Sequence, residues 1–207
     1  MDQYVGRAVP RKEGADKVTG RARYVDDITM PGMLHGVTVR STVPRGRITA
    51  IHYSNEIPWE QFTVVTAADI TNHIGGDNVV ALLVDDQPCL AAHAIRHAQE
   101  PVVLLAHPDK NLLESARRAV TIDVEPLPAV FSIDDSLACK EIIWGDDNIL
   151  KSYHMVKGDV DSVWATADHI VEGEYCTGAQ EQLYIENNGV IAVASQEDGV
   201  TVWGSLQ

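Results

Sequence analysis

Two histidines have a spacing that other proteins use for metal binding. His93 and His97 are four residues apart, so a helix would place both imidazoles on one face, as zinc proteases require. Ala94 stands where those enzymes carry a catalytic glutamate, and the stretch runs directly into an apolar run that begins at Pro101. The pattern therefore favours ordinary surface histidines over a metal site.

Pairs of adjacent aspartates are a second candidate, because two carboxylates can bind calcium or act as acid and base. None of the pairs has EF-hand spacing, and solvated loops are the simpler interpretation. The pairs are Asp85–Asp86, Asp134–Asp135 and Asp146–Asp147. The GxSxG, P-loop and GxGxxG motifs are also absent from the sequence. Judged from these residues alone, the chain shows no active site.

The cysteines indicate the redox environment. Cys89, Cys139 and Cys176 are odd in number and form no CxxC pair, which predicts free thiols in a reducing compartment. Cys176 lies in a stretch that alternates between apolar and polar residues, and we expect it in a core or an interface.

Composition places the chain among globular proteins. Of its 207 residues 45% are hydrophobic, which is enough for a packed core. No apolar stretch approaches the roughly 18 residues that a membrane span needs. The N-terminus has neither a positive n-region nor an apolar h-region. We therefore expect a cytoplasmic protein with no membrane partner.

The charge is unevenly distributed along the chain. The formal net charge is −14, which argues against a nucleic-acid partner, because phosphate neutralisation needs clustered Lys and Arg. Residues 1–47 hold nine Lys or Arg against five acidic residues, whereas residues 48–207 hold seven against twenty-five. We expect the basic N-terminal arm to lie on an acidic surface of its own chain or of a partner subunit.

Hydrophobic patterning predicts several short strands and one clear helix. The helix covers residues 110–120 and places Leu112, Leu113, Ala116 and Ala119 on one apolar stripe. A single helical turn is expected at residues 67–70. Runs with strand character occupy residues 34–40, 47–57, 62–66, 79–84, 101–106 and 121–124. Because strands outnumber helices, the predicted fold class is α+β.

A second unit follows a connector rich in proline and acidic residues. A short helix is expected from residue 158, with Val160, Val163, Trp164 and Ala167 on one face, and strands at 169–176, 183–194 and 200–206, the last two joined by a turn at 197–199. About 50 residues with two or three strands and one helix bury little apolar surface alone. This predicts a larger domain that has been cut short.

A series of motifs in a fixed order resembles one known family. The opening motifs, Val5-Gly6-Arg7, Val9-Pro10-Arg11 and residues 16–28, are similar to the start of the molybdenum-binding subunit of xanthine dehydrogenase/aldehyde oxidase enzymes. Later motifs that match in order are Pro31-Gly32-Met33-Leu34-His35-Gly36, residues 64–70, Glu125-Pro126-Leu127-Pro128-Ala129-Val130, residues 178–186 and Val202-Trp203-Gly204-Ser205-Leu206-Gln207. The sequence departs from the family at two places. It has His97-Ala98-Gln99-Glu100-Pro101-Val102 where the family usually has a glycine before Gln/Glu-Pro-Val-Ala, and Gln182 in place of the commoner histidine. Both departures bear on the subfamily rather than on membership.

The resemblance implies a domain organisation. After an N-terminal arm at residues 1–17, an α/β hammerhead domain would cover residues 18–130. A connector at residues 131–157 would lead to the truncated start of a molybdopterin-binding domain at residues 158–207. This agrees with the two units that the patterning indicates.

The resemblance also implies a chemistry. In that family, a molybdenum–molybdopterin cofactor hydroxylates a carbon of a purine, an N-heterocycle or an aldehyde, and electrons leave through [2Fe–2S] clusters to FAD on partner domains or subunits. The glutamate that takes up the proton and the Gly-rich loop around the metal lie beyond residue 207. The expected chain is therefore part of a molybdenum-dependent oxidoreductase, structural and inactive alone, with no catalytic or metal-ligating residue. Its partners would be the remainder of the molybdenum-binding subunit, the iron–sulfur and flavin subunits, and the substrate.

One cofactor-binding residue is carried over by the resemblance. Gln207 corresponds to the glutamine whose amide contacts the apical molybdenum ligand, and an amide donates a hydrogen bond without adding charge or a competing ligand. The simpler alternative is a terminal residue without a role. Glu181 and Glu186 are acid–base candidates by type, but capping turns or pairing with the basic arm is the simpler interpretation. A rival function from a different class is a freestanding binding or assembly module without catalytic activity.

Overall fold

The chain divides into two units. The computed structural model describes residues 5–72, 76–81 and 84–206. The sheet unit comprises Gly32–Asp159, and the hairpin unit comprises Met1–Pro31 together with Val160–Gln207. No helix among the described residues is long and apolar enough to cross a membrane.

The sheet unit contains two three-stranded antiparallel sheets, with the orders β1-β5-β3 and β4-β2-β6. On the central strand of the first sheet, Leu105 lies opposite Val37 on one neighbouring strand and Val64 on the other. Directly opposed residues point to the same face of a sheet, so these three apolar side chains form one row. The strands are β1 (His35–Arg40), β2 (Gly46–Tyr53), β3 (Thr63–Val65), β4 (Ala94–Ile95), β5 (Pro101–His107) and β6 (Val120–Pro126).

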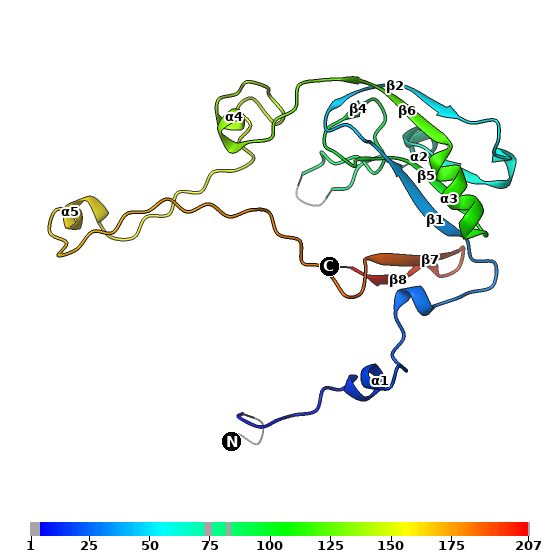
Figure 1. Ribbon diagram of the computed structural model, residues 1–207, viewed down its shortest axis with the longest axis horizontal. Coiled ribbons are helices and arrows are strands. Elements are labelled where there is room, and N and C mark those ends of the chain that lie inside the picture. The colour runs from blue at the N-terminus through cyan, green and yellow to red at the C-terminus, as the bar shows by residue number, and fades with distance from the viewer. Residues whose placement is uncertain (1–4, 73–75, 82–83, 207) are drawn as a thin grey trace. The chain divides into compact units, whose positions relative to one another are not determined.

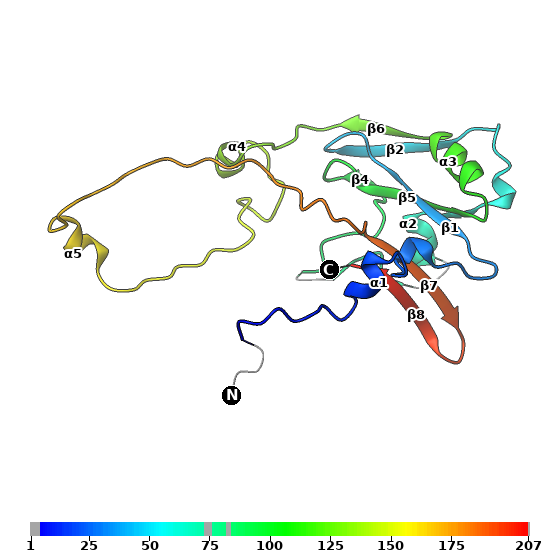
Figure 2. The same cartoon turned by 60° about the horizontal axis from the view of Figure 1, so that its bottom comes forward.

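The core of the sheet unit lies between β5 and helix α3 (Lys110–Arg118), which packs against β1 and β5 (Figures 1 and 2). Val103, Leu105 and Ala116 are fully buried, and Leu113 is 4% exposed. Leu112, on the edge of the predicted stripe, remains 42% exposed. The helix therefore buries the centre of its apolar stripe and leaves the edge in solvent.

Polar side chains hold both ends of α3. The Asp109 carboxylate accepts hydrogen bonds from the backbone N–H groups of Asn111 (2.7 Å) and Leu112 (3.2 Å), and these bonds lower the pKa of Asp109. In the last turns, the Arg117 guanidinium donates to Glu114 at 2.6 Å and 2.8 Å. This pairing, with a further bond from Arg118, lowers the pKa of Glu114 to about 2. The Asp109 side chain thus caps the start of the helix, and the ion pairs of Glu114 support its last turns.

The remaining elements of the sheet unit are short: η2 (Trp59–Gln61), α2 (Ala67–Asn72) and α4 (Ile133–Leu137). The segment with α4 is fastened by Arg45, which donates to the carbonyl of Pro128 (2.6 Å) and to Glu141 (2.9 Å). Ser132 caps α4 by accepting from the N–H of Asp135 at 3.1 Å. This helix falls inside the region that the sequence indicates as a connector.

The hairpin unit has little regular structure. Its elements are α1 (Gly14–Val18), η1 (Val25–Asp27), α5 (Val160–Trp164) and the antiparallel strands β7 (Gly189–Ser195) and β8 (Gly199–Ser205). Ile191, at 7% exposure, is the one buried hydrophobic residue among its described residues. Every residue from 160 to 185 is exposed.

Most of the sequence-based elements of the sheet unit are confirmed, but the strand predicted at residues 79–84 is wrong for the residues described there. An isolated bridge joins Val80 to Gln87, and residues 82–83 lie outside the described part. Next to it, the Asn78 side chain donates to the carbonyl of Leu90 (2.7 Å) and accepts from its N–H (3.1 Å). Hydrogen bonds from the Asn78 side chain to the backbone of Leu90 thus hold this segment, rather than backbone hydrogen bonds between strands.

In the hairpin unit, the strand predicted at residues 169–176 does not form. The strand predicted at residues 183–194 begins only at Gly189, as β7, and the strand predicted at residues 200–206 forms as β8. Alternation makes a strand only where a neighbouring strand supplies hydrogen bonds, and no described strand pairs with this segment. Cys176 is exposed, so its placement in a core is wrong. The expected apolar face of α5 is also open, with Val160, Val163 and Trp164 each more than half exposed.

Candidate functional site

The β7–β8 hairpin precedes Gln207, the residue that the sequence predicts to contact the cofactor. Its register runs from Gly189 opposite Ser205 to Ser195 opposite Gly199. The turn is built locally, because the Ser195 hydroxyl accepts from the N–H groups of Glu197 (3.1 Å) and Asp198 (3.2 Å). Gly199 completes it with φ of +75°, a conformation that favours glycine. The turn thereby fixes the register of β8.

Gln207 follows this strand two residues after Ser205 and lies outside the described residues, so its cofactor role stays a prediction. Residues 199–206 carry no charged side chain, and Ser205 is half-buried. The described end of the hairpin therefore offers neutral groups, which suit contact with a metal cofactor without adding a competing ligand.

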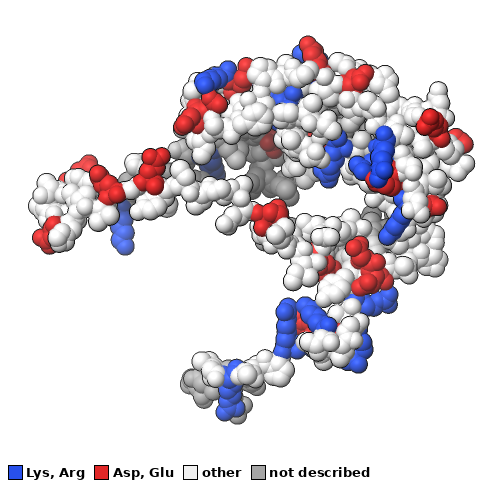
Figure 3. All heavy atoms as spheres, viewed as in Figure 1, with Lys and Arg blue, Asp and Glu red and all other residues white. Residues whose placement is uncertain are grey.

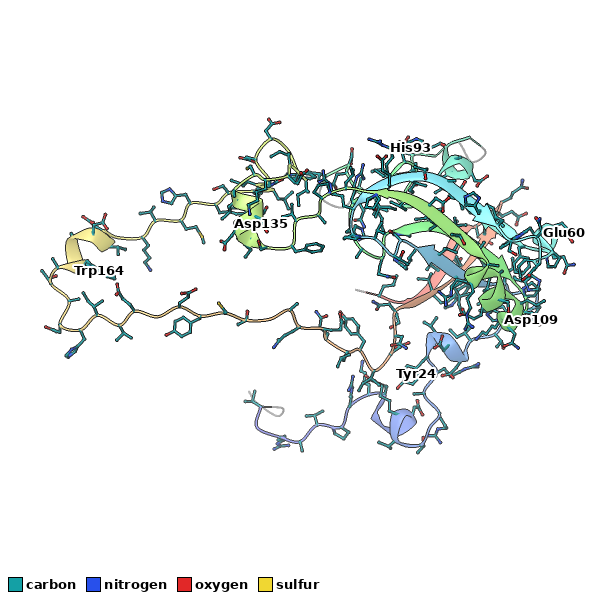
Figure 4. All side chains as sticks on the ribbon, turned by 45° about the horizontal axis from the view of Figure 1, so that its top comes forward. Tyr24, Glu60, His93, Asp109, Asp135 and Trp164 are labelled. Carbon is teal, nitrogen blue, oxygen red and sulfur yellow. The ribbon has the colours of Figure 1, made fainter. Side chains whose placement is uncertain are left out.

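A carboxylate ties the segment before this hairpin to η1. Glu186 accepts a hydrogen bond from the N–H of Val25 at 3.3 Å. Asp27 caps the same turn by accepting from the N–H of Tyr24 at 2.9 Å (Figure 4 labels Tyr24). A cavity of about 270 Å³ lies beside these groups, lined by residues 24–27 and 185–187. Glu186 thus binds a backbone turn rather than standing free as an acid or base, whereas Glu181 is exposed.

The two histidines line a larger cleft of about 790 Å³ within the sheet unit. They do not share a helix face, because strand β4 occupies the two residues after His93; Figure 4 labels His93. The His97 ring hydrogen-bonds the carbonyl of Ala98 at 2.9 Å. Among the described residues, no three His, Cys, Asp or Glu side chains are placed to hold a metal ion. The two histidines therefore lack the shared helix face on which the zinc-protease pattern depends.

The same cleft is bounded by the turn at residues 96–100, which side-chain hydrogen bonds stabilise. Glu100 is 2% exposed and accepts from the N–H of Arg96 at 2.5 Å. The Arg96 guanidinium donates to the carbonyl of Asp86 at 3.0 Å. The charged residues of this cleft therefore include two that hold loop backbone in place.

The other paired acids serve turns and surface pairs. The Asp135 carboxylate lies 2.5 Å from the Lys140 ammonium group, and this ion pair lowers the pKa of Asp135 (Figure 4 labels Asp135). Asp147 accepts from the N–H of Ile149 at 3.0 Å. All three cysteines are free thiols, as predicted, with Cys139 and Cys176 exposed and Cys89 partly buried.

Two family models match the chain in sequence. Residues 19–128 match the a/b hammerhead domain of aldehyde oxidase and xanthine dehydrogenase. Residues 144–207 match the molybdopterin cofactor-binding domain. The predicted fold, a hammerhead domain followed by the start of a molybdopterin-binding domain, is confirmed.

Curated relatives extend the match over nearly the whole chain. The nicotinate dehydrogenase large molybdopterin subunit of Eubacterium barkeri is 29% identical over 206 residues, which cover 99% of this chain and 48% of that protein. The nicotine 6-hydroxylase large subunit of Paenarthrobacter nicotinovorans is 31% identical over 98% of this chain and 26% of that protein. The chain thus spans about half or less of the length of these relatives.

Solved structures share the fold. Quinoline 2-oxidoreductase from Pseudomonas putida 86 has a TM-score of 0.78 at 23% identity, covering 96% of this chain and 26% of that one. Aldehyde oxidoreductase from Desulfovibrio gigas has a TM-score of 0.77 at 25% identity, covering 94% of this chain and 23% of that one. Since the hammerhead model alone matches residues 19–128 of 207, the chain belongs to the aldehyde oxidase and xanthine dehydrogenase family.

Proposed function

We propose that this chain forms the N-terminal part of the molybdenum-binding subunit of a hydroxylase. The observation that carries the proposal is the order of its parts: a hammerhead match at residues 19–128 precedes a cofactor-domain match at residues 144–207. The family resemblance adds the reaction, hydroxylation of a purine, N-heterocycle or aldehyde carbon. The chain alone is structural and inactive in this proposal.

The domain boundaries belong to the same proposal. The arm covers residues 1–17, the hammerhead domain residues 18–130, the connector residues 131–157 and the start of the cofactor domain residues 158–207. The partners are the remainder of the molybdenum-binding subunit and the iron–sulfur and flavin subunits. Relatives named as the large subunit of nicotine 6-hydroxylase and as a gamma subunit of a dehydrogenase complex support a multi-subunit assembly.

Within that assembly, Gln207, which follows β8 in the sequence, would contact the cofactor. The cofactor supplies a two-electron redox centre when bound. The carboxamide of Gln207 would donate a hydrogen bond to a ligand of the metal and so help to hold the cofactor. The turn at Ser195 and Gly199 fixes the register of β8, and the bond between Glu186 and Val25 fastens the segment before β7.

The first experiment compares the purified chain with the complex isolated from its native host. We expect the chain alone to contain no stoichiometric molybdenum, iron or flavin and to hydroxylate neither xanthine, nicotinate nor an aldehyde with a dye acceptor. We expect the complex to contain about one molybdenum per chain and to turn over one of these classes. About one molybdenum per isolated chain would refute the inactivity of the chain. A native complex without molybdenum would favour the assembly module instead.

The second experiment replaces Gln207 with Ala in the complex. Loss of an oriented donor beside a metal ligand lowers turnover by about 10–100-fold, while the fold is kept. Gln196→Ala changes the same residue type in the exposed turn of the same hairpin and serves as the matched control. Full turnover of Gln207→Ala at full molybdenum occupancy would exclude the proposed contact.

A further inference from the structure

Two segments of the hairpin unit carry opposite charge. The basic arm, residues 5–23, has six Lys or Arg and two acidic residues, a net charge of +4. The acidic strap, residues 160–186, has six Asp or Glu and no Lys or Arg, a net charge of −6. Figure 3 shows the Lys and Arg side chains gathered on the segment that carries α1.

Almost every residue of both segments is exposed to solvent. In the basic arm, Gly14 and Ala22 are partly buried and all other residues are exposed. In the acidic strap, Glu186 is partly buried and all other residues are exposed. Each segment also carries apolar side chains in solvent, such as Val18 (86% exposed) in the arm and Val171 (90% exposed) in the strap.

The ion pairs within the arm leave cationic charge in excess. Arg11 and Lys17 both lie near Glu13, at 2.8 Å and 3.7 Å, and Arg21 lies 3.2 Å from Asp16. Two acids therefore serve three cations. These pairs are exposed, and exposed pairs exchange readily for better ones.

One hydrogen bond already joins the two segments at their ends. The N–H of Val25, two residues after the arm, donates to the carboxylate of Glu186, the last residue of the strap, at 3.3 Å. From this anchor, both segments run back toward lower residue numbers. Joined ends raise the effective concentration of one segment for the other to the millimolar range.

The charges match in position as well as in sign. Counted from the anchor, Arg21 and Glu181 lie four and five residues away. Farther out, Lys12 lies 13 residues away, and Glu174 and Glu172 lie 12 and 14 residues away. At about 3.3 Å per extended residue and 1.5 Å per helical residue, the arm cations reach out to about 50 Å, within the roughly 60 Å over which strap carboxylates up to Asp168 extend.

We propose that the basic arm lies along the acidic strap of the same chain as an electrostatic clasp, hinged at the Val25–Glu186 bond. Its role is to hold the strap that leads into the β7–β8 hairpin. The clasp uses this chain's own residues and does not depend on the cofactor, so its test is separate from that of the proposed function.

Zero-length carbodiimide cross-linking of the full chain at low salt tests the clasp, because it joins an ammonium and a carboxylate only when they touch. Lys140 and Asp135, 2.5 Å apart, provide the internal positive control. We expect cross-links from Lys12 to Glu172 or Glu174, and from Lys17 to Glu181, in the monomer band. Raising the salt to about 1 M should reduce these products about tenfold, since screening then acts within about 3 Å.

The paired variant Glu172→Gln/Glu174→Gln should remove the Lys12 products and keep the Lys17–Glu181 product. The control Glu197→Gln, in the exposed hairpin turn, should change neither. The proposal is overturned if the Lys140–Asp135 product forms and no arm–strap product does. It is also overturned if arm–strap products occur only in a dimer band, which would assign the contact to a second copy.

Discussion

The two units of this chain use similar apolar patterns and reach different degrees of burial. In the sheet unit, each strand finds partners within the chain, and α3 covers their apolar face, so Val103, Leu105 and Ala116 are fully buried. In the hairpin unit, β7 and β8 pair with each other, and Val190, Val200 and Val202 stay more than half exposed. A two-stranded hairpin without a covering layer is marginally stable. The difference lies in the available partners rather than in the local pattern.

The largest expected effect tests burial in the sheet unit. Leu113→Asp places a charge in the space where Leu113 is 4% exposed, and should lower the free energy of unfolding by about 4 kcal/mol. The neighbouring Leu112→Asp is the matched control, because Leu112 is 42% exposed in the first turn of α3. It should change that free energy by less than about 0.5 kcal/mol. Urea unfolding followed by circular dichroism measures both, and equal losses would show that α3 does not bury one side.

The sequence predicts this core well because its signals are local. The apolar stripe of α3 and its Asp109 cap can be recognised from spacing alone, and the strands beside it are short β-branched runs. Prediction from the sequence fails where strand formation depends on a neighbouring strand from elsewhere in the chain. Residues 169–176 alternate as well as any strand, but no described strand pairs with them, and β4 is too short, at two residues, to have a pattern.

The candidate site divides in the same way. Membership of the family could be predicted from the order of the motifs alone, because it requires no knowledge of which side chains are in contact. The bond between Glu186 and Val25 could not be predicted, because it joins residues 161 positions apart through a backbone N–H that has no sequence signal. Likewise, the His93 and His97 spacing is compatible with a helix until the pairing of β4 with β2 excludes it.

A smaller effect is expected from the charges that support α3. The ion pairs with Arg117 and Arg118 lower the pKa of Glu114 from its ordinary 4.5 to about 2. This pairing therefore stabilises the fold above pH 4.5. The stabilisation is lost as the pH falls through about 2, when the folded state takes up the proton. Glu114→Gln should therefore lower Tm at pH 7 and lessen the fall in Tm between these pH values.

Glu60→Gln is the control for this titration, since Glu60 is an exposed carboxylate on η2 (Figure 4). It should keep the wild-type dependence of Tm on pH. Thermal unfolding at several pH values distinguishes the two variants. A pH profile of Glu114→Gln that coincides with that of the wild type would show that the ion pairs of α3 do not contribute to stability.

The smallest effect should come from the same chemical change made in the hairpin unit. Val202 is 54% exposed on β8, so Val202→Asp removes little buried surface and its carboxylate stays in water. The free energy of unfolding of the chain should change by less than about 0.5 kcal/mol. Ile191→Asp is the contrast on the paired strand, because Ile191 is 7% exposed and a charge there should open the hairpin. Amide hydrogen exchange of β7 and β8, with the midpoint of the sheet unit measured in parallel, reads out both changes. If Val202→Asp opened the hairpin as fully as Ile191→Asp, the side chain of Val202 would be buried in solution. The hairpin unit would then bury its apolar side chains much as the sheet unit does, and the proposed difference in burial between the two units would be wrong.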